Sequence, residues 1–166
     1  AKYSLDDDPF SEKEEELLRI DTLCRKKFAW IPWGGGANQP WCIEKEPIEH
    51  RIRVRFRIVS EIELTGAKLA LETPLDAKIT LNGAPVSNVA DGYYVDKSIE
   101  CVALPTVPAG VSELEVEYPF GQRTALEWMY ILGDFDVEVD GKTAGYGLFT
   151  NADHPDVFLY DYAFFK

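Results

Sequence analysis

Five aromatic side chains lie in or beside segments that the sequence predicts to be loops, and they are the residues best suited to ligand binding. Residues 30–41 hold three tryptophans with three glycines and two prolines, a composition that precludes regular structure. Aromatic rings can stack on the C–H faces of a sugar ring, and loops of β-domains commonly carry ligands. The candidate sugar contacts are Trp30, Trp33, Trp41, Tyr93 and Tyr94. The alternative is that these aromatics close the ends of the core or pack on a neighbouring domain.

The sequence offers few groups for catalysis or metal binding. His50 and His154 are the only histidines, and Cys-x-x-Cys and His-Glu-x-x-His patterns do not occur, so we expect neither a zinc site nor another cofactor. Oxygen ligands in the loops at 91–92 and 151–153 leave a structural calcium ion open. Burial would raise the pKa of Glu127 beside Trp128, but we favour an outward-facing strand position for it and assign no catalytic residue.

Charge and cysteine usage narrow the classes of partner. The net charge is −12, from 17 basic and 29 acidic residues, so we expect neither nucleic acid nor an anionic membrane as a partner. The cysteines at 24, 42 and 101 are an odd and scattered set, which favours reduced thiols over a disulfide framework. Reduced thiols favour the cytoplasm slightly over secretion, and the compartment is otherwise undetermined.

From residue 51 onward, apolar and polar side chains alternate with a period of two, which indicates half-buried strands. Turn signals such as Asn82-Gly83 and Asp140-Gly141 separate the strands, and no helical pattern intervenes. This predicts a mainly β domain, an antiparallel jelly-roll β-sandwich over residues 29–166. The expected strands are Arg51–Ile58, Lys68–Glu72, Ala77–Leu81, Tyr93–Val95, Glu100–Leu104, Glu113–Tyr118, Leu126–Leu132, Phe135–Val139 and Val157–Phe164.

Charged residues alternate along three of these strands. Arginines occupy every second position from 51 to 57, and glutamates occupy 113, 115 and 117. A second acidic series runs from 134 to 140. Because opposite charges across neighbouring strands attract, we expect the arginine strand to lie beside the strand at 113–118 as a solvated, salt-bridged face. A binding site for an acidic sugar or a phosphate is the alternative.

The N-terminal segment, residues 1–28, differs from the rest. Its first ten residues are expected to be irregular, and Ser11 with Glu14 has the spacing of a capping box, which predicts one short helix after residue 11. Leu17, Ile20 and Cys24 would share one helix face with Phe28. We interpret this acidic segment and helix as a packing element, and as a candidate remnant of a preceding domain.

Several short motifs occur in a recognisable order. The basic and apolar strand at 51–58 is followed by Leu81-Asn82-Gly83, by a proline and glycine loop at 107–112, and by a Tyr-Ile-Leu-Gly-Asp-Phe segment at 130–135. Over roughly residues 50–140 this order resembles the sugar-binding jelly-roll domain of family-two glycoside hydrolases and of α-L-rhamnosidase-like proteins. The resemblance implies a galactose-binding-like fold. It also implies that catalysis belongs to a separate barrel domain, so no catalytic residue is carried over.

The expected function is therefore that of a non-catalytic accessory domain of a larger glycoside hydrolase-like protein. Its expected partners are carbohydrate and the catalytic domain of the parent chain. One alternative is a structural protein-interaction domain without carbohydrate affinity. A small stand-alone hydrolase is a second alternative, which neither a nucleophile motif nor an acid pair supports.

Overall fold

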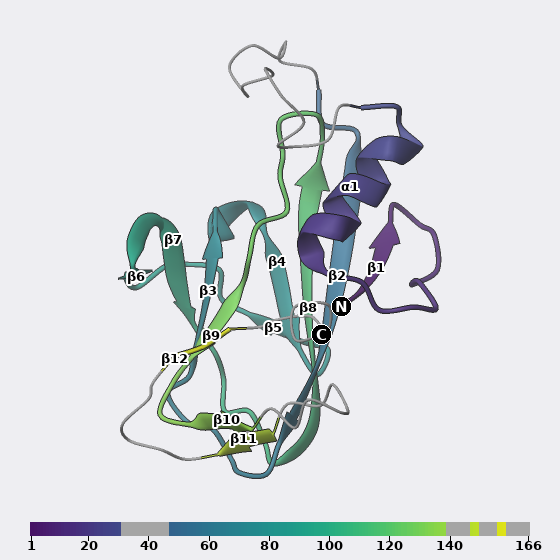
Figure 1. Ribbon diagram of the computed structural model, residues 1–166. Coiled ribbons are helices and arrows are strands. Elements are labelled where there is room, and N and C mark those ends of the chain that lie inside the picture. The colour runs from purple at the N-terminus through teal and green to yellow at the C-terminus, as the bar shows by residue number, and fades with distance from the viewer. Residues whose placement is uncertain (31–46, 139–146, 150–155, 159–166) are drawn as a thin grey trace.

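The computed structural model describes residues 1–30, 47–138, 147–149 and 156–158 (Figure 1). The protein is mainly β, with 42% strand and 12% helix, and its sheets are antiparallel except for one parallel contact between β11 and β2. This confirms the predicted mainly β, antiparallel class with one N-terminal α-helix.

In the described part of the chain, the strands form two sheets. The first has the order β10 (Asp136–Glu138), β11 (Gly147–Phe149), β2 (His50–Ser60), β8 (Gly110–Phe120), β4 (Lys78–Leu81) and β5 (Ala84–Val86), with β1 (Lys2–Leu5) also paired to β2. The second has the order β12 (Asp156–Phe158), β9 (Tyr130–Leu132), β3 (Lys68–Glu72), β7 (Asp96–Ala103) and β6 (Tyr93–Tyr94). Helix α1 (Leu17–Lys27) and a short 3-10 turn, η2 (Pro74–Asp76), complete the described elements.

The longest pairing joins β2 to β8 and confirms the predicted charge pairing. Arg53, Arg55 and Arg57 lie opposite Glu117, Glu115 and Glu113, respectively. The Arg55 guanidinium is 2.8 Å from a Glu115 carboxylate oxygen and 3.3 Å from a Glu113 oxygen. The alternating apolar residues of both strands, which include Ile52, Val54, Leu114 and Val116, are buried in one core between the layers. On this arginine face, Arg55 is salt-bridged to β8, Arg51 pairs with Asp7, and Arg53 donates to the Ser4 hydroxyl.

The first residues are ordered, so the expectation of an irregular N-terminus is wrong. Strand β1 pairs with the first half of β2 in the register Lys2↔Arg55 to Leu5↔Ile52. Local sequence gave no alternation long enough to signal this strand; an available edge of β2 supplies its hydrogen-bond partners. The predicted capping box is also wrong, because the Ser11 hydroxyl accepts a bond from the Tyr3 N–H at 3.1 Å. The helix begins at Leu17 instead, where the Glu16 side chain caps the Leu18 N–H.

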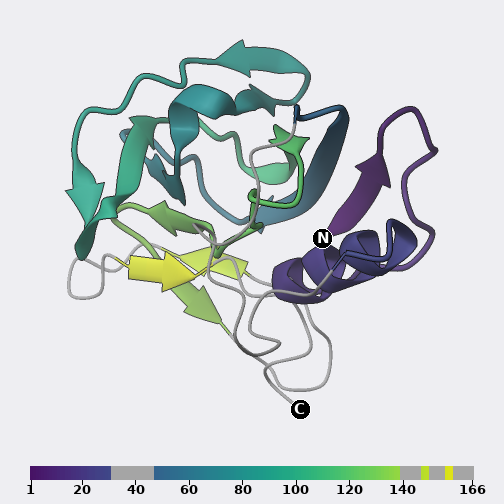
Figure 2. The same ribbon diagram turned by 90° about the horizontal axis from the view of Figure 1, so that it is seen from above.

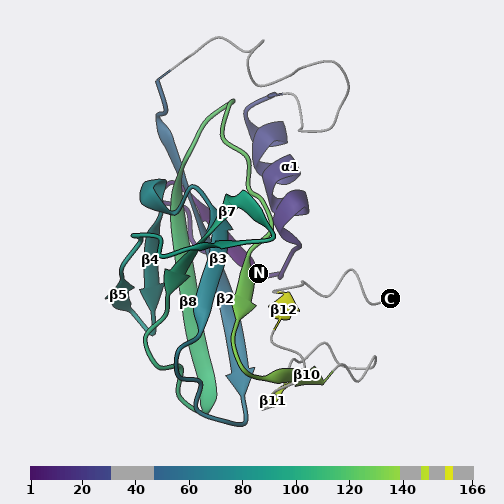
Figure 3. The same cartoon turned by 90° about the vertical axis from the view of Figure 1, so that its left-hand side faces the viewer.

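Helix α1 packs on the same core as the sheets. Its buried apolar residues are Leu17, Ile20 and Cys24, the face that the sequence predicts, while Phe28 is partly buried just beyond the last turn. The helix lies on the same side of the β2–β8 pair as β9 and β12 (Figures 2 and 3). The segment 1–28 is therefore continuous with the sandwich-like core, and its origin as a remnant of a preceding domain stays a prediction.

Other strands also depart from the expectation: β7 begins at Asp96, four residues before the predicted start, and β11 was not predicted. The predicted strand Leu126–Leu132 is only partly correct, because just Tyr130–Leu132 forms β9. The Leu126 N–H instead bonds to the Asp21 carboxylate of α1 at 3.3 Å, which draws residues 126–129 away from a ladder. The short strand β5 was not predicted. It completes a hairpin whose turn residues, Asn82 and Gly83, both have positive φ, as a type I′ turn requires.

Candidate functional site

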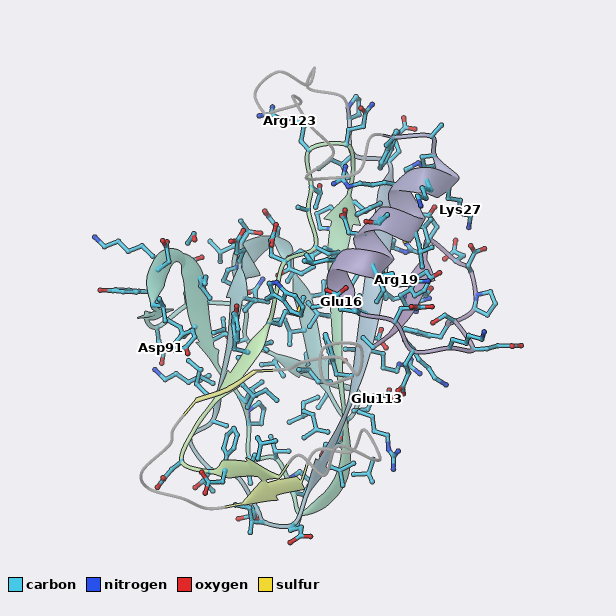
Figure 4. All side chains as sticks on the ribbon, in the orientation of Figure 1. Glu16, Arg19, Lys27, Asp91, Glu113 and Arg123 are labelled. Atoms are coloured by element: carbon cyan, nitrogen blue, oxygen red, sulfur yellow. The ribbon has the colours of Figure 1, made fainter. Side chains whose placement is uncertain are left out.

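Two hollows adjoin at the end of the sheets where β3 and β8 terminate. The first is a cavity of about 400 Å³ between the end of β3, η2, the end of β8 and the segment 123–129. The second, of about 600 Å³, lies between the end of α1, the start of β2 and the segment 120–124. Arg123 and Thr124 line both hollows, so the two share a wall. Figure 4 shows Arg123 at this end, beyond the arrowhead of β8.

The first hollow combines three acidic residues with polar and apolar neighbours. Glu72, Asp76 and Glu127 contribute carboxyl groups, Tyr118 and Met129 are buried beneath them, and Arg123 is the cation of the lining. The Tyr118 hydroxyl donates to the Glu72 backbone carbonyl at 2.8 Å, which ties β8 to the end of β3. The hollow therefore offers hydrogen-bond acceptors above apolar surface, with an excess of negative charge.

Burial dominates the ionisation of two of these acids. It raises the pKa of Glu127, and the negative charges of Glu72 and Asp21 raise it further. Burial likewise raises the pKa of Glu72, with a smaller contribution from Asp96. The sequence pattern favours an exposed, outward-facing position for Glu127 over a buried one. Its expected position is wrong, because Glu127 lies in the irregular segment before β9 and lines a cavity.

The rim of the first hollow holds a strained residue. Thr73 has φ 46° and ψ 53°, the left-handed conformation that a β-branched residue rarely adopts. It precedes Pro74, and the residue before a proline prefers an extended conformation. Such strain costs on the order of 1–3 kcal/mol and tends to cluster at ligand-binding or catalytic sites.

The second hollow is built on an aromatic cluster. The Trp30 ring lies 4.6 Å from the Phe28 ring, 5.7 Å from the Phe120 ring and 5.9 Å from the His50 ring, measured between centroids. Phe28 in turn stacks on His50 at 4.0 Å. Trp30 is partly buried against the core and also lines the hollow.

The structure does not bring together the three candidate sugar contacts that it describes, Trp30, Tyr93 and Tyr94. Trp30 lies at the end of α1, whereas Tyr93 and Tyr94 form β6 at the edge of the second sheet, on the opposite side of the molecule (Figures 1 and 2). Tyr93 is 59% exposed, and the Tyr94 ring contacts the Tyr130 ring at 5.5 Å. Trp33 and Trp41 lie outside the described residues. The role of each as a sugar contact stays a prediction.

Sequence reasoning missed most of the residues that line the first hollow. Glu72 ends a correctly predicted strand, Thr73 follows it, and Asp76 belongs to the next turn. The dipeptide Thr73-Pro74 was the available signal, since a residue before proline at the end of a strand marks an unusual turn. Arg123 and Thr124 carried no local signal, because only the packing of α1 brings their segment to this position.

The buried pair of Asp21 and Arg25 holds that segment against α1. The Arg25 Nε lies 2.7 Å from the Asp21 carboxylate, and its Nη1 donates to the Gln122 carbonyl at 3.0 Å. Its Nη2 donates to the Thr124 carbonyl. The wall shared by the two hollows is therefore fixed by a guanidinium from the helix.

Neither a metal cluster nor a membrane-spanning helix is found among the residues that the structure describes. In these residues, three or more His, Cys, Asp or Glu side chains do not converge as metal ligands. Asp91, one of the oxygen ligands considered for calcium, pairs with the Lys68 ammonium at 3.0 Å, and the loop at 151–153 lies outside the described ranges. Within the same ranges, α1 is too short and too polar to cross a bilayer.

No protein-family model matches the sequence, and no curated protein matches it significantly.

Proposed function

We propose that this chain is a non-catalytic accessory domain of the jelly-roll, galactose-binding-like type, which binds carbohydrate in the two adjoining hollows. The observation that carries the proposal is the shared wall at Arg123 and Thr124, which joins an acceptor-rich cavity to one lined by Trp30. Hollows of this size are typical of small-molecule sites. A sugar needs both features, since its hydroxyls seek hydrogen bonds and its C–H faces seek aromatic surface.

The charge of the first hollow narrows the class of sugar. Glu72, Asp76 and Glu127 outnumber Arg123, so an anionic ligand would be repelled. The arginine face offers no better site for an acidic sugar, because Arg55 is paired with Glu113 and Glu115 and Arg51 with Asp7. The proposed ligands are therefore neutral sugars, whose hydroxyls donate to carboxylate oxygens.

Burial raises the pKa of both Glu72 and Glu127, so each carboxyl is a hydrogen-bonding group in a partly desolvated site. The resemblance of residues 50–140 to sugar-binding domains supports a binding role for this site, with catalysis in another domain of a glycoside hydrolase-like parent.

A titration with neutral methyl glycosides tests the proposal. We expect millimolar methyl galactoside, glucoside or rhamnoside to shift the backbone amide signals of residues 122–127 and the indole signal of Trp30, while glucuronate does not. Glu127→Ala should weaken binding about tenfold through the lost charge-assisted hydrogen bond. The matched control is Glu63→Ala, an exposed acid between β2 and β3. Unshifted signals with all three neutral sugars would refute carbohydrate binding at this site.

A second candidate function, a protein-interaction domain, is favoured by exposed apolar residues near β6. Val95 is 83% exposed, and its φ of 59° is strained for a β-branched residue. Tyr93, Leu75 and Val89 are also exposed large apolar residues. The Asn88 side chain donates to the Leu75 carbonyl at 3.2 Å, which brings these two segments together. The proposed occupant is the catalytic domain of the same parent chain.

Hydrogen exchange separates this candidate from the first. If β6 contacts a flanking domain, the amides of residues 89–95 should exchange more slowly in a longer polypeptide of the gene than in this chain alone. Equal exchange in both polypeptides would contradict the interaction surface, and it would leave the sugar titration unaffected.

A further inference from the structure

We propose that Asp21 and Arg25 of helix α1 are positioning residues, which hold segment 122–127 in the conformation that forms both hollows. The inference rests on the proposed function only in treating those hollows as a ligand site. It assigns to the N-terminal helix a role in the site, although no residue of the helix from Leu17 to Lys27 lines either of the two hollows.

The contacts of the pair reach the segment at three successive places. Arg25 donates to the carbonyls of Gln122 and Thr124, and the second Asp21 oxygen accepts from the Leu126 N–H. These contacts join positions 97, 99 and 105 residues apart in sequence. Because alternate backbone groups of the segment are bound, the positions of the intervening Arg123 and of the following Glu127 are constrained.

The burial of the pair makes this constraint rigid. Arg25 is 1% exposed and Asp21 is 3% exposed, so water does not compete for their hydrogen bonds. The Arg25 guanidinium also lies over the Phe120 ring, 5.7 Å from its centroid, and Phe120 lines the second hollow. One side chain thus contacts the base of the second hollow and the wall that separates it from the first.

A contribution to stability alone does not explain such a pair. Two charges lose their hydration on burial, and replacing a buried ion pair by apolar groups of similar volume is often neutral or stabilising. What an apolar pair cannot supply is the forked set of donors that satisfies two carbonyls and a carboxylate at once. The specific effect of these hydrogen bonds is to determine the backbone path of segment 122–126.

The pair is also electrically linked to the first hollow. The negative charge of Asp21 is one of the causes that raise the pKa of Glu127. Asp21→Asn retains an oxygen for the Leu126 N–H but removes that charge. The variant should therefore lower the pKa of Glu127, a change that a purely structural role of Asp21 does not predict.

The test compares Asp21→Asn with three further variants by NMR, without any sugar. Arg25→Lys keeps the charge but loses the fork, and it should shift the amide signals of 122–126. The double variant Asp21→Asn with Arg25→Met removes the buried charges, so it should retain a folded core while the same signals stay displaced. The matched control is Arg19→Met, which breaks the ion pair of 2.8 Å between Arg19 and Glu15 and should leave 122–126 unchanged. Figure 4 shows Arg19 on α1, the helix that also carries Asp21 and Arg25.

The outcomes distinguish a positioning role of Asp21 and Arg25 from a purely structural role. Displaced 122–126 signals in a folded double variant, with a lowered pKa of Glu127 in Asp21→Asn, support positioning. Native signals for 122–126 in the double variant and in Arg25→Lys would overturn it. The readout needs no ligand, so a protein that binds no sugar but shows the displaced signals would overturn the proposed function alone. If sugar does bind, Arg25→Lys should weaken it about tenfold, while Arg19→Met should not.

Discussion

The β2–β8 pair and the segment 121–129 are neighbours in the chain, yet they are stabilised in different ways. Along β2 and β8, apolar side chains that face the core alternate with charged side chains that face outward. In the segment, the backbone groups of Gln122, Thr124 and Leu126 bond instead to side chains of a helix about a hundred residues away. The first region follows a local period, and the second depends on three tertiary hydrogen bonds to α1.

The β2–β8 pair is therefore the scaffold, and segment 121–129 is part of the candidate site. The β2–β8 pairing, called the ladder below, has many equivalent contacts. Losing one outer charge should therefore change the stability of the protein little. The segment has a few unique contacts, and both hollows depend on them. Functional groups commonly lie on loops that a rigid scaffold positions. In this protein, hydrogen bonds from Asp21 and Arg25 position the loop.

The largest expected effect tests the core of the ladder. Leu114→Ala removes a fully buried side chain from β8 and should lower the free energy of unfolding by about 2–5 kcal/mol, because lost transfer free energy and a cavity add. Urea denaturation monitored by circular dichroism measures the change. A loss below about 1 kcal/mol would contradict the view that the β2–β8 pair organises the core.

The next effect concerns the turn between β4 and β5. Gly83 has φ +78°, so Gly83→Ala forces a side chain into the left-handed region and should cost about 1–2 kcal/mol. Space is not the cause, since a Cβ at this position meets no atom within 4 Å. Denaturation of this variant beside Gly66→Ala, another glycine with positive φ in open space, should give similar losses. An unchanged stability would mean that the turn is not of type I′.

A smaller effect is expected for the outer face of the ladder. A double-mutant cycle between Arg55→Ala and Glu115→Ala should give a coupling energy of about 0.2–1 kcal/mol, because the pair is partly exposed and screened. The coupling should fall when salt is raised to about 1 M. A coupling far above this range would show that the arginine face is not an ordinary solvated surface.

The smallest expected effect is a change in the pH dependence of stability at the first hollow. Burial raises the pKa of Glu127 in the folded state, so folding favours its protonated form. Its stabilising contribution is present below the unfolded pKa of about 4.3 and is lost as the pH rises through the folded value.

Glu127→Gln should therefore be more stable than the unmodified protein at pH 7, and this advantage should disappear below about pH 4. Thermal unfolding across pH 4–7 measures it, with Glu63→Gln as the exposed control. A variant less stable than the unmodified protein at pH 7 would show that the Glu127 carboxylate has a stabilising partner.

Local periodicity predicted most of the central strands and the side chains that they bury. The arginine strand and its acidic neighbour were expected beside each other, and the register places Arg55 opposite Glu115. Periodicity predicted the buried face of α1 equally well. It failed for β1, whose four residues are too few to show a period and which forms because the edge of β2 is available.

The candidate site was far less predictable. Trp30 was expected at a ligand surface and lines one hollow, but Tyr93 and Tyr94 lie on the opposite side of the molecule. Glu127 was expected to face outward from a strand, and its segment is held by α1 instead. Composition suggested which residue types could bind a sugar, but it carried no information on which of them share a cavity.

By itself, the sequence determined the mainly β class, the two-residue alternation, the pairing of opposite charges and the acidic balance, because each depends on the chemistry of near neighbours. Only the tertiary structure decided that Glu72, Asp76, Arg123 and Glu127 line one hollow beside Trp30. The reason is that a buried guanidinium on α1 must satisfy its donors, and the carbonyls that meet this need lie on a segment distant in sequence.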